Sequence, residues 1–140
     1  MATVYTLTKP KEAWSLVSHF LGNDLLTIAM YSDQSKDWGM DEQFSSERRE
    51  RVVYEHRTKL IGVFYLMVRR LKANGHEEEA AKIQQILDMV IDQDVTNPDV
   101  RKAIHDKHRE LDPNVAEFEK VVAETNAQAE ARCQAEAEST

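Results

Sequence analysis

Apolar side chains recur at spacings of three and four along most of the chain, which is the period of one face of an α-helix. The pattern is clear over 10–21, 77–92 and 98–111, and three of the four glycines and all three prolines stand where it breaks. Glycine and proline at such breaks are typical of helix boundaries. The pattern therefore predicts an all-α fold, a compact bundle of about five helices around one long central helix at 45–73.

The residues before the central helix predict two short helices. The first covers 10–21, and its apolar face consists of Ala13, Trp14, Val17, Phe20 and Leu21. Gly22 ends this helix, and the polar pair that follows can cap a second helix at 23–31. Residues 32–44 then form a connection that is longer than most connections between helices.

The central helix contains the longest apolar stretch of the chain, Leu60–Val68. This stretch is apolar on every side of the helix, which predicts burial all round, either by other helices or by a second copy of the chain. Gly62 lies within it and costs about 1 kcal/mol relative to alanine in a helix interior. We therefore interpret Gly62 as a point of close contact between two helices.

Three further helices follow the central one. Asn74–Gly75 provides a left-handed cap that reverses the chain into a return helix at 77–92. Two more helices begin at Pro98 and Pro113, each preceded by a residue, Asn97 or Asp112, whose side chain can cap the helix. The residues expected to face the core are Ala80, Ile83, Leu87, Val90 and Ile91, then Val100, Ile104 and Leu111, and finally Val115, Phe118, Val121 and Val122.

The two ends of the chain lack this apolar pattern. We expect a short extended arm at 1–9, and at 126–140 a polar extension of the last helix or a disordered tail. The remaining residues, 10–125, are expected to form a single helical-bundle domain, since 140 residues is a common size for one domain.

Cysteine content and hydropathy indicate the compartment. Cys133 is the one cysteine of the sequence, so no internal disulfide can form, and a reducing cytoplasm is expected. The first ten residues lack the apolar run of a signal peptide, and the nine residues 60–68 are far fewer than the ~20 that cross a bilayer. We expect neither export nor membrane insertion.

Charge is distributed unevenly along the chain. The formal net charge is −7, yet residues 45–74 carry eight Lys or Arg and three Glu, a balance of +5 that leaves −12 for the rest. An acidic average argues against nucleic-acid binding through net charge. The basic segment keeps an alternative open, in which phosphates contact Arg48, Arg49, Arg51, Arg57, Lys59, Arg69, Arg70 and Lys72.

These basic residues do not share one face of the helix. A helical wheel places 48, 51, 55, 59, 62, 66 and 70 on one line, where Glu55, Gly62 and Leu66 interrupt the Arg and Lys residues. A line broken in this way favours a structural role, in which the basic ends are solvated or pair with acidic helices, including those of a second subunit.

One dipeptide resembles an enzyme motif. His105–Asp106 is similar to the central pair of the HD phosphohydrolases, whose metal site adds an earlier His and a later Asp. His56 or His76 is available as the earlier ligand and Asp112 as the later one. Asp112 suits a helix cap better, and a dipeptide alone is weak evidence.

Other chemistry finds less support. His105 and His108 are too few ligands for a stable zinc site, and no Glu precedes a His by three residues as helical di-iron sites require. The acidic segment 33–41 lacks the spacing of a calcium-binding EF-hand loop. The run Glu77–Glu79 fits the positive end of a helix dipole, and no nucleophile elbow or phosphate-binding loop is present. The sequence predicts a protein that is not an enzyme and uses no metal or cofactor.

The remaining hypothesis is recognition of another protein. Trp38, Met40 and Phe44 lie in the long connection, and tryptophan is enriched among the residues that dominate protein interfaces. We expect a small acidic inhibitor, adaptor or assembly factor that uses these residues and that forms a homodimer through its apolar centre. A nucleic-acid-associated subunit and an HD phosphohydrolase are the alternatives.

Overall fold

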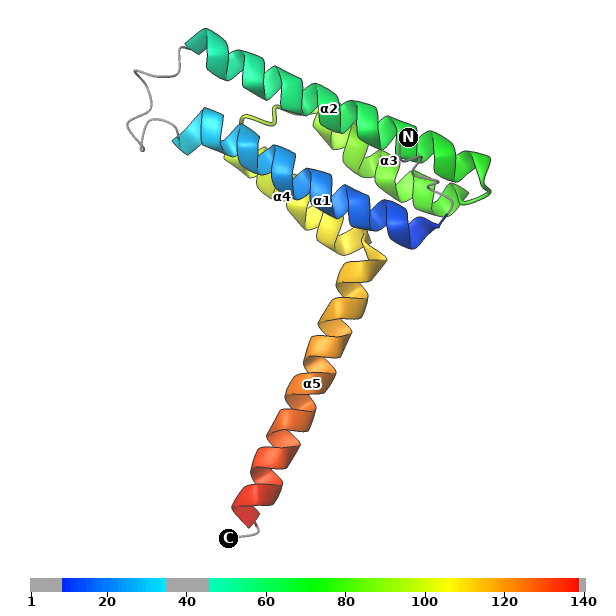
Figure 1. Ribbon diagram of the computed structural model, residues 1–140, viewed down its shortest axis with the longest axis vertical. Coiled ribbons are helices and arrows are strands. Elements are labelled where there is room, and N and C mark those ends of the chain that lie inside the picture. Colours follow the sequence, from blue (N-terminus) through cyan, green and yellow to red (C-terminus); the bar gives the residue numbers. More distant parts are fainter. Residues whose placement is uncertain (1–8, 35–45, 139–140) are drawn as a thin grey trace, which may run out of the picture.

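The computed structural model describes residues 9–34 and 46–138, which are almost entirely helical (Figure 1). The elements are α1 (Pro10–Ala29), the π-helical turn η1 (Met30–Gln34), α2 (Ser46–Ala73), α3 (Glu77–Asp92), α4 (Pro98–Leu111) and α5 (Pro113–Glu138). The predicted all-α bundle with a long helix at 45–73 is thus confirmed, and no strand occurs in the described ranges. None of the helices in these ranges has the apolar length that spanning a membrane requires. The predicted N-terminal arm and most of the long connection lie outside the described residues.

Helices α1 to α4 form a four-helix arrangement. Helix α2 packs against α1 and α3, and α4 packs against the same two helices from the other side, so α2 and α4 occupy opposite corners (Figure 1). Gly75, at φ +83°, makes the predicted reversal between α2 and α3, because glycine adopts this left-handed conformation without strain. The predicted caps also form, since Asn97 accepts the Asp99 N–H and Asp112 accepts the Asn114 N–H.

One hydrophobic core joins these four helices. The apolar faces predicted for the first helix, the return helix and the helix at 98–111 supply much of it, and Trp14, Leu87 and Ile104 are each at most 1% exposed. Phe64 and Met67 contribute from the middle of α2. Ile91, expected to face the core, is instead 42% exposed.

The predicted break at Gly22 is wrong. Helix α1 continues through Gly22 as far as Ala29. The physical reason is that Leu21, Leu25 and Ile28 follow one another at spacings of four and three and are all buried, so the apolar face crosses the glycine without interruption. Burial of these side chains outweighs the roughly 1 kcal/mol that a glycine costs in a helix interior.

The other described helices of the same chain cover only part of the centre of α2. Within one chain the stretch 60–68 is buried on one side of the helix only, because Tyr65 and Leu66 remain 54% and 49% exposed. Gly62 is exposed as well, and a Cβ placed on it would meet no atom within 4 Å. The glycine therefore makes no close contact with another helix of its own chain.

The last helix differs most from its prediction. Helix α5 leaves the bundle and extends away from it (Figure 1), and none of its 26 residues is buried. Phe118, Val121 and Val122, expected to face the core, are 68%, 53% and 40% exposed. The helix continues to Glu138 and thus includes most of the polar segment after residue 125.

Candidate protein-binding surfaces

Helix α5 carries an apolar stripe that the rest of the described chain, 9–34 and 46–112, leaves uncovered. Phe118, Val122, Thr125, Ala129 and Cys133 follow one another at spacings of four, three, four and four, which puts them on one face of the helix. Every residue from Ala116 to Glu138 is exposed. Single exposed apolar residues are ordinary on protein surfaces, but a continuous stripe along an isolated helix is typical of a binding face.

The charges of α5 lie around this stripe. The helix contains six Glu against one Lys and one Arg, a formal charge of −4. Glu119 and Glu130 lie along one edge of the stripe, Glu124 and Glu138 lie on the side of the helix away from it, and Glu136 follows in line with it. The face is therefore apolar from Phe118 to Cys133 and acidic along one edge and at its far end.

The base of α5 is tied to the bundle. Asn114 donates its side-chain N–H to the Lys11 carbonyl at 3.3 Å, and Lys11 Nζ lies 3.5 Å from Glu117 Oε2. Asp112 caps the helix by accepting the Asn114 N–H at 2.8 Å. These contacts join the first turn of α5 to the first turn of α1.

A second uncovered face lies on α2, on the side away from the core. Its middle is formed by the small residues Thr58 and Gly62, and Tyr54, Tyr65 and Leu66 stand around them with 66%, 54% and 49% of their surface exposed. Arg51 and Arg69 lie near the two ends of this face, and the Arg69 guanidinium stacks 5.8 Å from the centre of the Tyr65 ring. We call these residues the α2 outer face.

The eight predicted phosphate-contacting residues are spread around α2 and not gathered on one side. Arg57 points to the end of α3, where its Nε and Nη2 donate to the carbonyls of Val90 and Ile91 at 3.2 and 2.8 Å. Lys59 lies 3.4 Å from buried Asp24 and above the ring of Phe20. The other six, Arg48, Arg49, Arg51, Arg69, Arg70 and Lys72, lie nearer the two ends of the helix, and all but half-buried Arg49 are exposed.

The residues of the helical-wheel line, in contrast, share one environment. Residues 48, 51, 55, 59, 62, 66 and 70 are all exposed.

The predicted partner-binding residues, Trp38, Met40 and Phe44, lie outside the described residues.

The histidine and aspartate residues of the HD hypothesis have different partners and do not form one site among the described residues. His108 Nε2 lies 2.8 Å from Asp112 Oδ2, and both residues are buried. Asp106 lies on the surface, 2.8 Å from Lys102 Nζ, and this contact lowers the pKa of the carboxyl group. Among the described residues no three His, Cys, Asp or Glu side chains come together in a way that could hold a metal ion.

A buried ion pair between α1 and α2 was not predicted. Asp24 is 1% exposed, and its Oδ1 lies 2.8 Å from His56 Nδ1 and 3.4 Å from Lys59 Nζ. Sequence spacing could not reveal this pair, because its members lie 32 and 35 residues apart on different helices. The one available signal was an acidic residue at position 24 within an apolar face.

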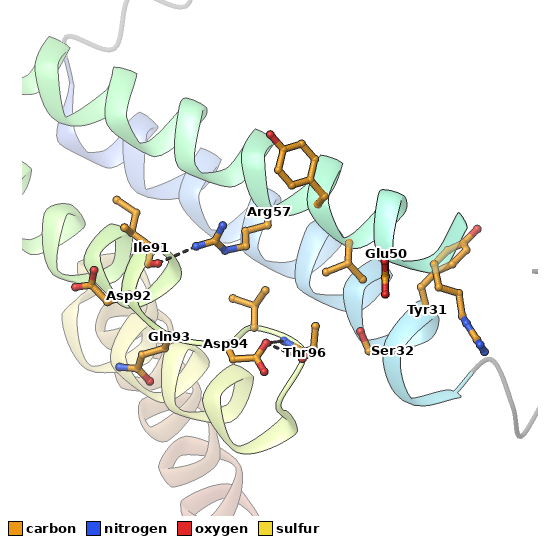
Figure 2. A pocket seen from close by; sticks show the side chains of 13 residues that line it. Tyr31, Ser32, Glu50, Arg57, Ile91, Asp92, Gln93, Asp94 and Thr96 are labelled. Carbon is orange, nitrogen blue, oxygen red and sulfur yellow. Dashed lines mark hydrogen bonds between the residues drawn. The ribbon is translucent and has the colours of Figure 1, made fainter. Parts of the chain in front are cut away.

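A pocket of about 680 Å³ lies between the start of α2 and the connection from α3 to α4 (Figure 2). Two of its polar side chains, those of Arg57 and Asp94, bond to residues nearby. Figure 2 shows Arg57 bonded to Ile91, and Asp94 accepting from Thr96. The side-chain and backbone donors of Thr96 lower the pKa of Asp94, so its carboxylate is a structural acceptor. We assign this pocket no reaction.

Comparison with protein-family models, curated proteins and solved structures found no match to this chain.

Proposed function

We propose that this chain is a protein-binding module without enzymatic activity, an inhibitor, adaptor or assembly factor that acts through α5 and the α2 outer face. The observation that carries the proposal is the apolar stripe of α5, which its own bundle leaves uncovered. The single cysteine, exposed on this helix, supports a reducing compartment, so we include the cytoplasm in the proposal.

The physical argument concerns what stabilises a helix. In folded proteins most helical stability comes from packing of an apolar face, and the 23 consecutive exposed residues 116–138 lack such packing. The many alanines of α5 replace part of the missing stabilisation, because alanine has the highest helix propensity. Burial of Phe118 and Val122 against a partner would add roughly 1.5–3 kcal/mol for each side chain. Association thus provides the packing that folding leaves unsatisfied.

The basic residues of α2 support a nucleic-acid role less well. Arg57 and Lys59 contact other residues of the protein itself, and between Arg51 and Arg69 this side of α2 exposes Tyr54, Tyr65 and Leu66 together with the acidic Glu55. A chain with a net charge of −7 also repels a phosphate backbone at long range.

The test is capture of a partner that depends on the α5 stripe. The immobilised full chain is incubated with lysate of its source cells, and the bound proteins are identified by mass spectrometry and purified. We expect Phe118→Glu/Val122→Glu to weaken binding of the purified partner at least tenfold in calorimetry. Glu124→Gln/Glu138→Gln, on the side of α5 away from the stripe, is the matched control and retains binding.

Nucleic acid serves as the competing ligand in the same study. Short duplex DNA and single-stranded RNA are titrated at two salt concentrations. Salt-sensitive binding that is lost in Arg48→Ala/Arg49→Ala/Arg51→Ala and unaffected by the α5 variants would overturn the proposal.

A further inference from the structure

We infer that α5 binds the α2 outer face of a second copy of this chain, and that the exchange is reciprocal, so that two copies form a two-fold dimer held by their α5 helices. The inference rests on the proposed function, since it names the partner of the same two surfaces. Three observations carry it: the position of α5 in the fold, the shapes of the two faces, and their charges.

The fold keeps α5 away from the α2 outer face of its own chain. Helix α5 starts at the end of α4, and α4 and α2 occupy opposite corners of the bundle (Figure 1). The base of α5 lies beside the first turn of α1, where Asn114 donates to the Lys11 carbonyl, and the rest of α5 extends away from the bundle (Figure 1). The stripe of α5 can therefore meet an α2 outer face only on another molecule.

The two helices also agree in length. At about 1.5 Å per residue, the 26 residues of α5 extend roughly 39 Å and the 28 residues of α2 roughly 42 Å. Each can lie along the other for most of its length.

The two faces complement each other in side-chain size. The stripe of α5 begins with the larger Phe118 and Val122 and continues with the smaller Ala129 and Cys133. The α2 outer face is small in its middle, at Thr58 and Gly62, and larger on either side. Phe118 and Val122 of α5 can pack over Thr58 and Gly62 in the middle of α2. The smaller Ala129 and Cys133 of α5 then leave room for one of the two tyrosines of α2.

Gly62 is the most specific element of this fit. A glycine destabilises the interior of a helix relative to alanine, and among the described residues no atom lies within 4 Å of a Cβ placed on Gly62. A glycine exposed between Thr58, Tyr65 and Leu66 allows the backbone of a second helix to approach closely.

Charge distinguishes this arrangement from the alternative in which two α5 helices pair with each other. Helix α2 carries eight Lys or Arg against three Glu, a formal +5, whereas α5 carries −4. Pairing of α5 with α2 joins opposite charges, whereas pairing of α5 with α5 joins two acidic helices. Like charges across an interface disfavour association by several kcal/mol.

The expected interface has the size of a stable one. Roughly half of the residues along each helix face the partner in such a packing, about 13 of the 26 residues of α5 and about 14 of the 28 residues of α2. Because the exchange is reciprocal, each copy contributes both sets. The total of about 27 residues a side lies within the 20–30 that specific interfaces use.

The test uses reversal of charge on either face in the full chain. One variant is Arg51→Glu/Arg69→Glu on α2, and the other is Glu119→Lys/Glu130→Lys on α5. Light scattering with size-exclusion chromatography and sedimentation velocity measure association, and circular dichroism verifies that each variant is folded. Glu124→Lys/Glu138→Lys, on the side of α5 away from the stripe, is the matched control and changes the net charge as Glu119→Lys/Glu130→Lys does.

We expect a dimer for the unmodified chain and for the control, and at least a hundredfold weaker association for each reversed variant alone. An equimolar mixture of the two reversed variants should form a heterodimer, because acidic α5 then meets basic α2 in one contact and basic α5 meets acidic α2 in the other. Pairing between α5 helices predicts no such dependence on α2.

Three results would overturn the inference: a monomer at every concentration, a dimer that tolerates reversal on α2, or a mixture that does not associate. None of them would remove the proposed function, since capture of another protein through the α5 stripe would still stand. Conversely, loss of that capture leaves the self-association measurement unaffected.

Discussion

Asp112 shows how one side chain can serve two helices. Its Oδ1 accepts the Asn114 N–H at the start of α5, and its Oδ2 lies 2.8 Å from Nε2 of the buried His108 of α4. Buried polar groups destabilise a protein when they lose their partners, and a lost helix cap costs about 1 kcal/mol. This residue therefore links the bundle to the base of α5.

Replacement of Asp112 by alanine should destabilise the protein by about 2–4 kcal/mol, because it leaves His108 without its carboxylate and α5 without its cap. Asp106→Ala is the control, since the exposed pair of Asp106 with Lys102 contributes little. Urea-induced unfolding of both variants measures the difference. Equal stability of the two variants would show that the contacts of Asp112 do not stabilise the protein.

Single residues also explain which parts of the site the sequence could predict. The caps at Asn97 and Asp112 were predictable, because a polar side chain before a proline has few other uses at a helix start. The pairing of Asp24 with His56 was not predictable, since a local pattern gives no information on which helices become neighbours. The binding of a partner by Trp38, Met40 and Phe44 remains a prediction.

At the scale of the element, the spacing of apolar residues identifies the apolar face of a helix but does not indicate what covers that face. The same pattern predicted burial for Ile104 in α4, which is buried, and for Phe118 in α5, which is exposed. A stripe destined for the core and a stripe destined for another chain have the same spacing. The elements were therefore largely predictable, whereas the candidate binding surfaces needed the three-dimensional arrangement.

Glycine in a helix offers a test at this scale. Gly62→Ala and Gly22→Ala should each raise the free energy of unfolding of the dilute monomer by about 0.5–1 kcal/mol, because a Cβ at either position meets no atom within 4 Å. Thermal unfolding at low protein concentration measures this gain.

The two glycines should differ in association. Gly62→Ala is expected to weaken the dimer, since Gly62 lies in the α2 outer face, whereas Gly22→Ala in α1 leaves it unchanged. Equal association of both variants in sedimentation velocity would contradict the close approach of a second helix at Gly62.

At the scale of the whole molecule, the chain combines a four-helix body that buries its core with a helix that buries nothing. The body accounts for stability, through a core that Trp14, Phe64 and Leu87 help to form. Helix α5 adds acidic and apolar surface that the body does not need for folding. We propose that this division is the basis of function, with a rigid body presenting one binding face on α2 and an extended arm carrying the other.

Amide hydrogen exchange along α5 tests this account most directly. The full chain is studied by mass spectrometry at a concentration below the dimer dissociation constant and at one well above it. The account predicts rapid exchange over 117–133 in the dilute protein, where no tertiary contact protects the helix, and slow exchange over the same residues and over the middle of α2 in the concentrated protein. Slow exchange of α5 at both concentrations would mean that the helix packs on its own body, and rapid exchange at both would mean that no second copy covers it.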